Sequence, residues 1–288
     1  MKKKFLSLLL ALAMCLSLSV PAWAVEKAIT PEDNTANNRI VTLQEKGFFV
    51  ETFYGEGENA LHKLSSEKTK SEIKEHLSEN SLTLISVSSK SIYLKEKSFE
   101  NGTVTYVPMT KSEVMKTQLF FENNASVRAI ENPSPKQYGK LTITLTVSNN
   151  ARHQIWIDTR ADWEAPTLYG DVKLQPAGGD DRYAVTWGAN TVLSASSASC
   201  NGNYRNGQSI DPVRERIGEP GVYQWRFAER TTSGSAAEKI YSTIVLSPNV
   251  AYQGNTTWCE FTYTHNYYID VNQLAEWPIS IDAQNLPY

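Results

Sequence analysis

The segment from Leu141 to Val147 alternates strictly between apolar residues and threonine, and this pattern constrains the fold more than any other in the chain. Side chains of a β-strand point alternately to opposite faces, so the apolar residues share one face and the threonines share the other. The pattern predicts a half-buried antiparallel strand whose threonine face meets solvent.

Similar short segments follow, separated by turn-forming residues and with little helical periodicity. Short strands with regular turns between them are typical of sandwiches and barrels. We therefore expect residues 139–288 to form an antiparallel β-sandwich domain. The further strands are predicted at residues 152–159, 168–175, 182–187, 221–229, 238–246 and 256–271, with turns at 178–181, 201–202, 206–207 and 247–249.

The part of the chain before this domain predicts a small mixed α+β region at residues 58–130, so the expected fold class is mainly β. A thin apolar stripe predicts a surface helix over residues 58–79. Asn101-Gly102 lies between two β-rich runs and permits the backbone of a tight hairpin turn. Thr110 and Glu113 have the spacing of a helix capping box.

Two prolines within residues 131–138 predict a linker between the α+β region and the sandwich, because proline forces the preceding residue into an extended conformation. Residues 25–57 are predicted to be a largely extended N-terminal tail.

The first residues have the layout of an export signal. Lysines at positions 2–4 precede an apolar run from Phe5 to Val20, and Ala22-Trp23-Ala24 forms a small-x-small cleavage site. The run is short for a membrane anchor and is interrupted by serines, so we predict a signal peptide over residues 1–24, no transmembrane anchor, and secretion. The leader resembles those of proteins exported by bacteria with a single membrane.

Removing this leader takes three of the 28 basic residues and none of the 31 acidic ones, which leaves 25 against 31 and a net charge of −6. An acidic chain of this kind is not expected to bind nucleic acid. Cys200 and Cys259 then remain, and an oxidising compartment permits a disulfide between them. Two buried free thiols fit the sequence equally well. No motif suggests a cofactor, and none is expected.

Carboxylates gather around Asp162. Asp158, Asp162 and Glu164 lie close together beside Trp156 and Trp163. A carboxylate pair next to aromatic rings suits glycoside hydrolysis, in which one group protonates the leaving oxygen and the other acts as nucleophile or base. The same residues are also ordinary acids at the end of a strand, so no catalytic residue is assigned.

A second acidic group lies in the Gly178-Gly179-Asp180-Asp181 segment. It offers carboxylate and carbonyl oxygens for calcium, yet it also has the composition of a hairpin turn and lacks the regular acid spacing of a calcium loop. No metal site is predicted.

Aromatic residues are the most suggestive feature for binding. Trp258, Tyr267 and Tyr268 lie in one predicted strand, and exposed aromatic faces suit the apolar side of a sugar ring. We name these three as candidate binding residues. Trp187 and Trp225 are expected in the core instead, and His265 is expected to be a hydrogen-bonded histidine at its edge.

Export, strand pattern and missing catalytic motifs together favour a secreted, non-enzymatic β-sandwich protein. Its ligand would be an extracellular or cell-surface carbohydrate or protein. The alternative is a secreted hydrolase that uses the acids around Asp162. A third hypothesis is a membrane-perforating protein with a long β-hairpin over residues 238–268, which Pro248 weakens.

Overall fold

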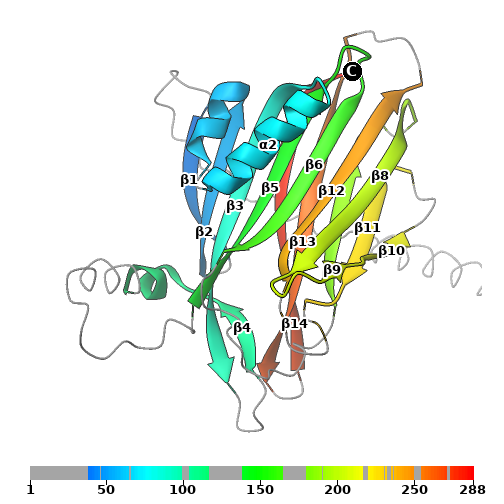
Figure 1. Cartoon of the computed structure of the whole chain (residues 1–288). Helices are drawn as coiled ribbons and strands as arrows, with labels where there is room; N and C mark the ends of the chain where they lie inside the picture. The colour runs from blue at the N-terminus through cyan, green and yellow to red at the C-terminus, as the bar shows by residue number, and fades with distance from the viewer. Residues whose placement is uncertain are drawn as a thin grey trace, which may run out of the picture. The chain divides into compact units, whose positions relative to one another are not determined.

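The computed structural model in Figure 1 contains one compact unit over Asn37–Tyr288. The predicted signal peptide, the predicted strand at 168–175 and residues 131–137 of the predicted linker lie outside the described part of the chain. The structure describes residues 38–45, 47–64, 66–98, 104–116, 138–164, 180–189, 191–216, 220–229, 231, 235, 237–249, 254–270 and 273–288.

Two antiparallel sheets make up most of the described residues, which confirms the predicted β-sandwich. Sheet A has the order β1-β2-β3-β5-β6-β12-β8-β9, and β4 also pairs with β3. Its strands are β1 (Asn38–Glu45), β2 (Phe48–Glu56), β3 (Thr83–Ser98), β4 (Val104–Pro108), β5 (Tyr138–Asn149), β6 (Ile155–Glu164), β8 (Leu193–Tyr204), β9 (Ser209–Ile210) and β12 (Ala237–Pro248).

Sheet B has the order β10-β11-β7-β13-β14. Apolar side chains from both sheets form one continuous core, in which Trp187 and Trp225 are buried as expected. The strands of sheet B are β7 (Asp181–Trp187), β10 (Val213–Arg216), β11 (Val222–Phe227), β13 (Thr256–Asp270) and β14 (Gln273–Pro287).

Strands from before and after the predicted linker belong to the same sheet. β3, from the predicted α+β region, pairs with β5 from Thr83↔Asn149 to Lys95↔Tyr138. β1 and β2 lie within the predicted extended tail and pair with each other, and β2 continues the sheet to β3. The division of the chain into separate domains stays a prediction.

Helical residues cover part of the outer face of sheet A. The predicted helix is present in two pieces, the 3-10 helix η1 (Glu58–Lys63) and the α-helix α2 (Glu67–Glu79). The Ser66 hydroxyl accepts a hydrogen bond from the Thr69 backbone N–H and caps α2. Leu61, Leu64 and Leu77 pack with Val87 and other residues of sheet A, so these helices form a third layer (Figure 1).

This layer overturns the prediction for the threonine face of β5. The strand itself is confirmed, but Thr142, Thr144 and Thr146 are all buried, as are Leu141 to Val147 on both faces. The alternation describes how side chains are divided between two faces. It does not reveal that α2 covers one of them.

Three other sequence expectations have clear outcomes. β3 and β4 pair as a hairpin down to Ser98↔Val104, while the predicted Asn101-Gly102 turn itself lies outside the described residues. The capping box is present, with Glu113 accepting from the Thr110 backbone N–H at 2.8 Å. The turn predicted at 201–202 is wrong, because Gly202 lies inside β8. A Cβ there would lie 2.6 Å from the Lys239 carbonyl oxygen, so glycine permits the close approach of β8 to β12.

The third hypothesis from the sequence, a membrane-perforating protein, rested on a long hairpin over 238–268, and this structure does not pair that segment as a hairpin. Membrane perforation itself stays a prediction. β12 pairs with β6 and β8 in sheet A, whereas β13 pairs with β7 and β14 in sheet B. The two halves of that segment therefore belong to opposite sheets of the sandwich. The sequence missed β14, whose Pro278 is compatible with a strand at the edge of a sheet.

Candidate functional site

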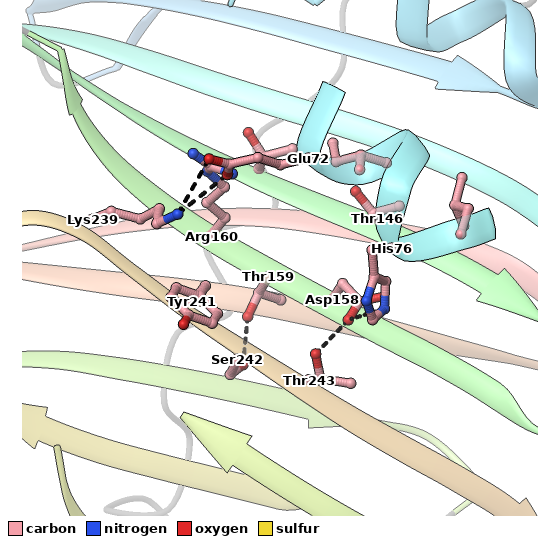
Figure 2. A pocket seen from close by; sticks show the side chains of 13 residues that line it. Glu72, His76, Thr146, Asp158, Thr159, Arg160, Lys239, Tyr241, Ser242 and Thr243 are labelled. Carbon is pink, nitrogen blue, oxygen red and sulfur yellow. Dashed lines mark hydrogen bonds and ion pairs between the residues drawn. The ribbon is translucent and has the colours of Figure 1, made fainter. Parts of the chain in front are cut away.

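A pocket of about 220 Å³ lies between α2 and the outer face of sheet A, and we call it the helix-covered pocket. Figure 2 shows Glu72 and His76 reaching from the helix toward side chains of β6 and β12. The pocket is lined by Glu72, Ile73, His76, Leu77, Thr144, Thr146, Asp158, Thr159, Arg160, Lys239, Tyr241, Ser242 and Thr243.

Compensating charges close one end of this pocket. Glu72 forms ion pairs with Arg160 and with Lys239 Nζ, the latter at 3.2 Å, and Arg160 also pairs with Asp162. Burial by itself raises the pKa of Glu72, but the hydrogen bonds and positive charges of Arg160 and Lys239 outweigh it and lower that pKa. These contacts join the helix to the sheet and leave this end without net charge.

A histidine and an aspartate face each other at the other end. His76 Nε2 lies 3.3 Å from Asp158 Oδ1, and the Thr243 hydroxyl donates a hydrogen bond of 2.6 Å to the same oxygen (Figure 2). The interaction with Asp158 raises the pKa of His76, although burial opposes the shift. Asp158 stands between Thr243 and His76, whereas a nucleophilic triad places the histidine between the hydroxyl and the carboxylate.

Three buried polar atoms at this end have no hydrogen-bond partner: Asp158 Oδ2, His76 Nε2 and Trp156 Nε1. The contact of His76 Nε2 with Asp158 is close enough for charge attraction but is not aligned as a hydrogen bond. The Trp156 and His76 rings lie 5.8 Å apart, so these atoms belong to one neighbourhood. An unsatisfied buried polar group costs about 1–3 kcal/mol, and more when it is charged.

The acids predicted as an alternative catalytic site lie on β6 rather than in a loop. Asp158 and Asp162 share the outer face and are four residues apart, about 13 Å along a strand. Glycosidase carboxyl groups are separated by about 5 to 10 Å. Asp162 is also held by Arg160, and the Glu164 side chain lies outside the described part of the structure. This geometry does not favour the hydrolase alternative.

Trp258, one of the predicted binding residues, lies in a second hollow of about 290 Å³, which we call the Trp258 cleft. Trp258 is 40 % exposed, so it is not part of the buried core. The cleft lies where β13 and β14 of sheet B meet β2 and β3 of sheet A. Its lining residues are Tyr54, Lys90, Trp258, Glu260, Ser280, Ile281, Asp282 and Gln284.

Two local features hold Trp258 in place. Thr257 pairs with Leu286 and Cys259 with Ala283, so Trp258 stands opposite two residues of a β-bulge, and Asn285 there has a left-handed φ of 56°. Bulges redirect side chains and are common next to functional sites. The indole also lies against Gly188, where an added Cβ would be 2.5 Å from Trp258 Nε1.

The other two predicted binding residues, Tyr267 and Tyr268, belong to the backbone of β13, but their side chains lie outside the described part of the structure. They are nine and ten residues from Trp258, about 30 Å along the strand. The three aromatic residues therefore do not form one platform for a single sugar ring.

Cys200 and Cys259 are free thiols, so the disulfide that the sequence left open is not formed. Cys200 lies on β8 of sheet A and Cys259 on β13 of sheet B. Burial raises the pKa of Cys200 to about 12 and also raises that of Cys259, whose side chain is fully buried. Both groups are neutral thiols at physiological pH and therefore poor nucleophiles.

His265 is buried and hydrogen-bonded, as predicted, and its partner is Asp181 from the predicted 178–181 turn. Asp181 also accepts hydrogen bonds from the Tyr263 hydroxyl and the Asn266 backbone N–H. Glu229 lies close to this pair: one polar side-chain atom each of Asp181, Glu229 and His265 lie within 4.8 Å of one another. These residue types could hold a cation, but three protein groups already occupy the Asp181 carboxylate.

Among the described residues, no helix is long and apolar enough to cross a membrane. Comparison with known proteins found no matching family model and no match among curated proteins.

The solved structures that resemble this chain do so only distantly. They include the collagen-binding subdomain ACE19 of the Enterococcus faecalis surface protein ACE, which is 10% identical with a TM-score of 0.28 over 46% of this chain and 88% of that one. A structure from work on Streptococcus parasanguinis adhesion by Fap1 fimbriae is 12% identical, with a TM-score of 0.23 over 48% and 72%. Clostridium perfringens delta-toxin is 7% identical, with a TM-score of 0.24 over 70% and 92%. Scores this low support no argument about fold or function, which rest on the geometry above.

Proposed function

We propose that this chain is a secreted, non-enzymatic β-sandwich protein that binds extracellular or cell-surface carbohydrate in the Trp258 cleft. The exposed Trp258 indole, fixed against Gly188 and redirected by the bulge, is the observation that supports this function. An aromatic face packs against the apolar face of a sugar ring, and nearby carboxylate and amide groups accept or donate hydrogen bonds to its hydroxyls.

The polar residues of the cleft match this chemistry. Glu260, Asp282 and Gln284 lie beside Trp258, and Gln284 Nε2 already donates to Asp282 Oδ2 at 2.7 Å, which orients both groups. Tyr267 and Tyr268, further along β13, are proposed as additional contacts for a ligand longer than one sugar ring.

A glycan array with the chain from Val25 onward tests this function. We expect binding to at least one glycan, and Trp258→Ala should weaken it by about tenfold or more, because buried tryptophans dominate the energy of binding sites. Val213→Ala is the control, since Val213 is an exposed apolar residue, at 56 %, that lines neither this cleft nor the helix-covered pocket. Gly188→Ala should weaken binding as well, because its Cβ displaces the indole.

Equal binding by Trp258→Ala would refute the proposal. A chain that binds no glycan but captures an extracellular protein stripped of its glycans would make protein the ligand class instead. The hydrolase alternative has its own test: alanine at Asp158, Asp162 or Glu164 should leave any hydrolysis of glycans or peptides unchanged, and a loss specific to these variants would revive it.

A further inference from the structure

We infer that the helix-covered pocket is a second binding site, separate from the Trp258 cleft, and that it takes a small, neutral, polyhydroxylated ligand such as a single sugar or a cyclic polyol. This inference does not depend on the proposed function of the cleft. It rests on two observations that coincide. Buried polar atoms lack hydrogen-bond partners, and they lie at a pocket that a helix covers and whose charged residues balance one another at one end.

The unpartnered polar atoms of the pocket match a ligand that carries hydroxyl groups. Asp158 Oδ2 is a buried acceptor without a donor. His76 Nδ1 lies 3.3 Å from the Asn80 amide nitrogen, which can only donate, so the proton of the neutral ring is assigned to Nε2. His76 Nε2 is then a buried donor without an aligned acceptor. A hydroxyl group satisfies both at once, since it donates to the carboxylate and accepts from the imidazole.

The charges in the pocket select a neutral molecule. Glu72 and Asp162 together balance Arg160 and Lys239, so this end offers no free charge to an ionic ligand. Asp158 at the other end repels an anion. A cation would compete for Asp158 with His76, whose Nε2 already lies 3.3 Å from Asp158 Oδ1.

The dimensions restrict the ligand to one small unit. The pocket holds about 220 Å³, which is below the roughly 300–1000 Å³ of sites for drug-sized molecules. Ile73 and Leu77 of α2 supply an apolar part of the lining, and the lining residue Tyr241 is half-exposed. A ring with hydroxyls on its rim and carbon on its faces fits this division.

The helix is attached to the sheet in a way that lets it accommodate such a ligand. Over the pocket, the polar contacts of α2 with the sheet are the ion pairs of Glu72 and the contact of His76 with Asp158, and its buried apolar residue there is Leu77. Polar contacts of this kind leave space between the two layers, which close-packed apolar side chains would fill.

The test is binding of D-glucose, D-galactose, N-acetyl-D-glucosamine, myo-inositol and glycerol to the chain from Val25 onward, followed by saturation-transfer NMR and calorimetry. We expect at least one ring compound to bind and glycerol to bind more weakly. Asp158→Asn should lower the affinity by about ten- to a hundredfold, which corresponds to one lost hydrogen bond to a charged group.

Asp282→Asn is the matched control, because it makes the same change on β14 of sheet B, outside this pocket and its charged residues, and it should change the affinity less than twofold. Trp258→Ala should also leave this affinity unchanged, which separates the two sites. His76→Ala, on the helix, tests the donor if Asp158→Asn does not fold. Binding of none of the five compounds, or equal affinity in the folded Asp158→Asn and His76→Ala proteins, would overturn the inference.

Discussion

The two faces of sheet A are buried by different means, and β5 shows the contrast within adjacent residues. Leu145 faces the sandwich core and is 1 % exposed, whereas Thr144 faces α2 and is 2 % exposed. The inner face is buried by close-packed apolar side chains of the opposite sheet. The outer face is buried by a helix that leaves a pocket lined with polar groups. Two residues that are equally buried, such as Leu145 and Thr144, can therefore differ in how much they stabilise the fold and in whether they border a space for a ligand.

The largest expected effect is on the inner face. Leu145→Ala should lower the free energy of unfolding by about 2–5 kcal/mol, because it removes buried methyl groups and leaves a cavity between rigid sheets. Urea denaturation followed by circular dichroism measures the change. A loss below about 1 kcal/mol would show that the core is loosely packed and that the contrast between the faces is false.

Loss of the helix cap should have an intermediate effect on the outer face. Ser66→Ala removes the acceptor for the Thr69 backbone N–H and should cost about 1 kcal/mol. We expect the part of the tryptophan fluorescence that Trp156→Phe removes to change at lower urea than the circular dichroism of the sheets, since the Trp156 ring lies 5.8 Å from that of His76 on α2. Coincident transitions would mean that helix and sandwich unfold as one unit.

A smaller effect is expected from the outer-face neighbour of Leu145. Thr144→Ala should cost less than about 1 kcal/mol, because the deleted atoms border an existing pocket rather than a packed interior. The measurement is the same denaturation as for Leu145→Ala, made on both variants in parallel. Equal losses in the two variants would contradict the distinction between the faces.

The smallest effect is a pH dependence of the outer face. The pKa of His76 is raised in the folded chain, so its attraction to Asp158 stabilises the fold fully below the unfolded histidine pKa of about 6.5 and is lost as the pH rises through the folded value. Glu79 adds to this attraction. His76→Gln should therefore be destabilised relative to the parent at pH 5 and not at pH 9, as thermal melting can show. A stability difference that does not change with pH would show that the charge interaction between His76 and Asp158 does not stabilise the fold.

Local patterns in the sequence predicted the strands and the caps because they depend on neighbours in the chain. The alternation at 141–147, the capping box at Thr110 and Glu113, and the long strand ending near residue 271 are each present. The serine-rich β8 was missed because its exposed residues give little alternation, and Gly202 was taken for a turn although its role is a close approach to β12.

Both proposed binding sites could be predicted only in part from the sequence. Trp258 stood out as an aromatic residue, but its exposure depends on the bulge with β14 and on Gly188, which lies 70 positions earlier in the chain. The helix-covered pocket was not anticipated at all. Asp158 was noticed as an acid, yet its partner His76 lies 82 positions away on a helix that was expected to lie at the surface.

The sequence by itself determined that this is a chain of antiparallel strands, since the two-residue period of a strand can be recognised from neighbouring residues alone. The tertiary structure decided which strands share a sheet, which face of β5 a helix covers and which polar atoms are left without partners. Those outcomes depend on contacts between residues far apart in the chain, where no local period applies, and both proposed sites are built from such contacts.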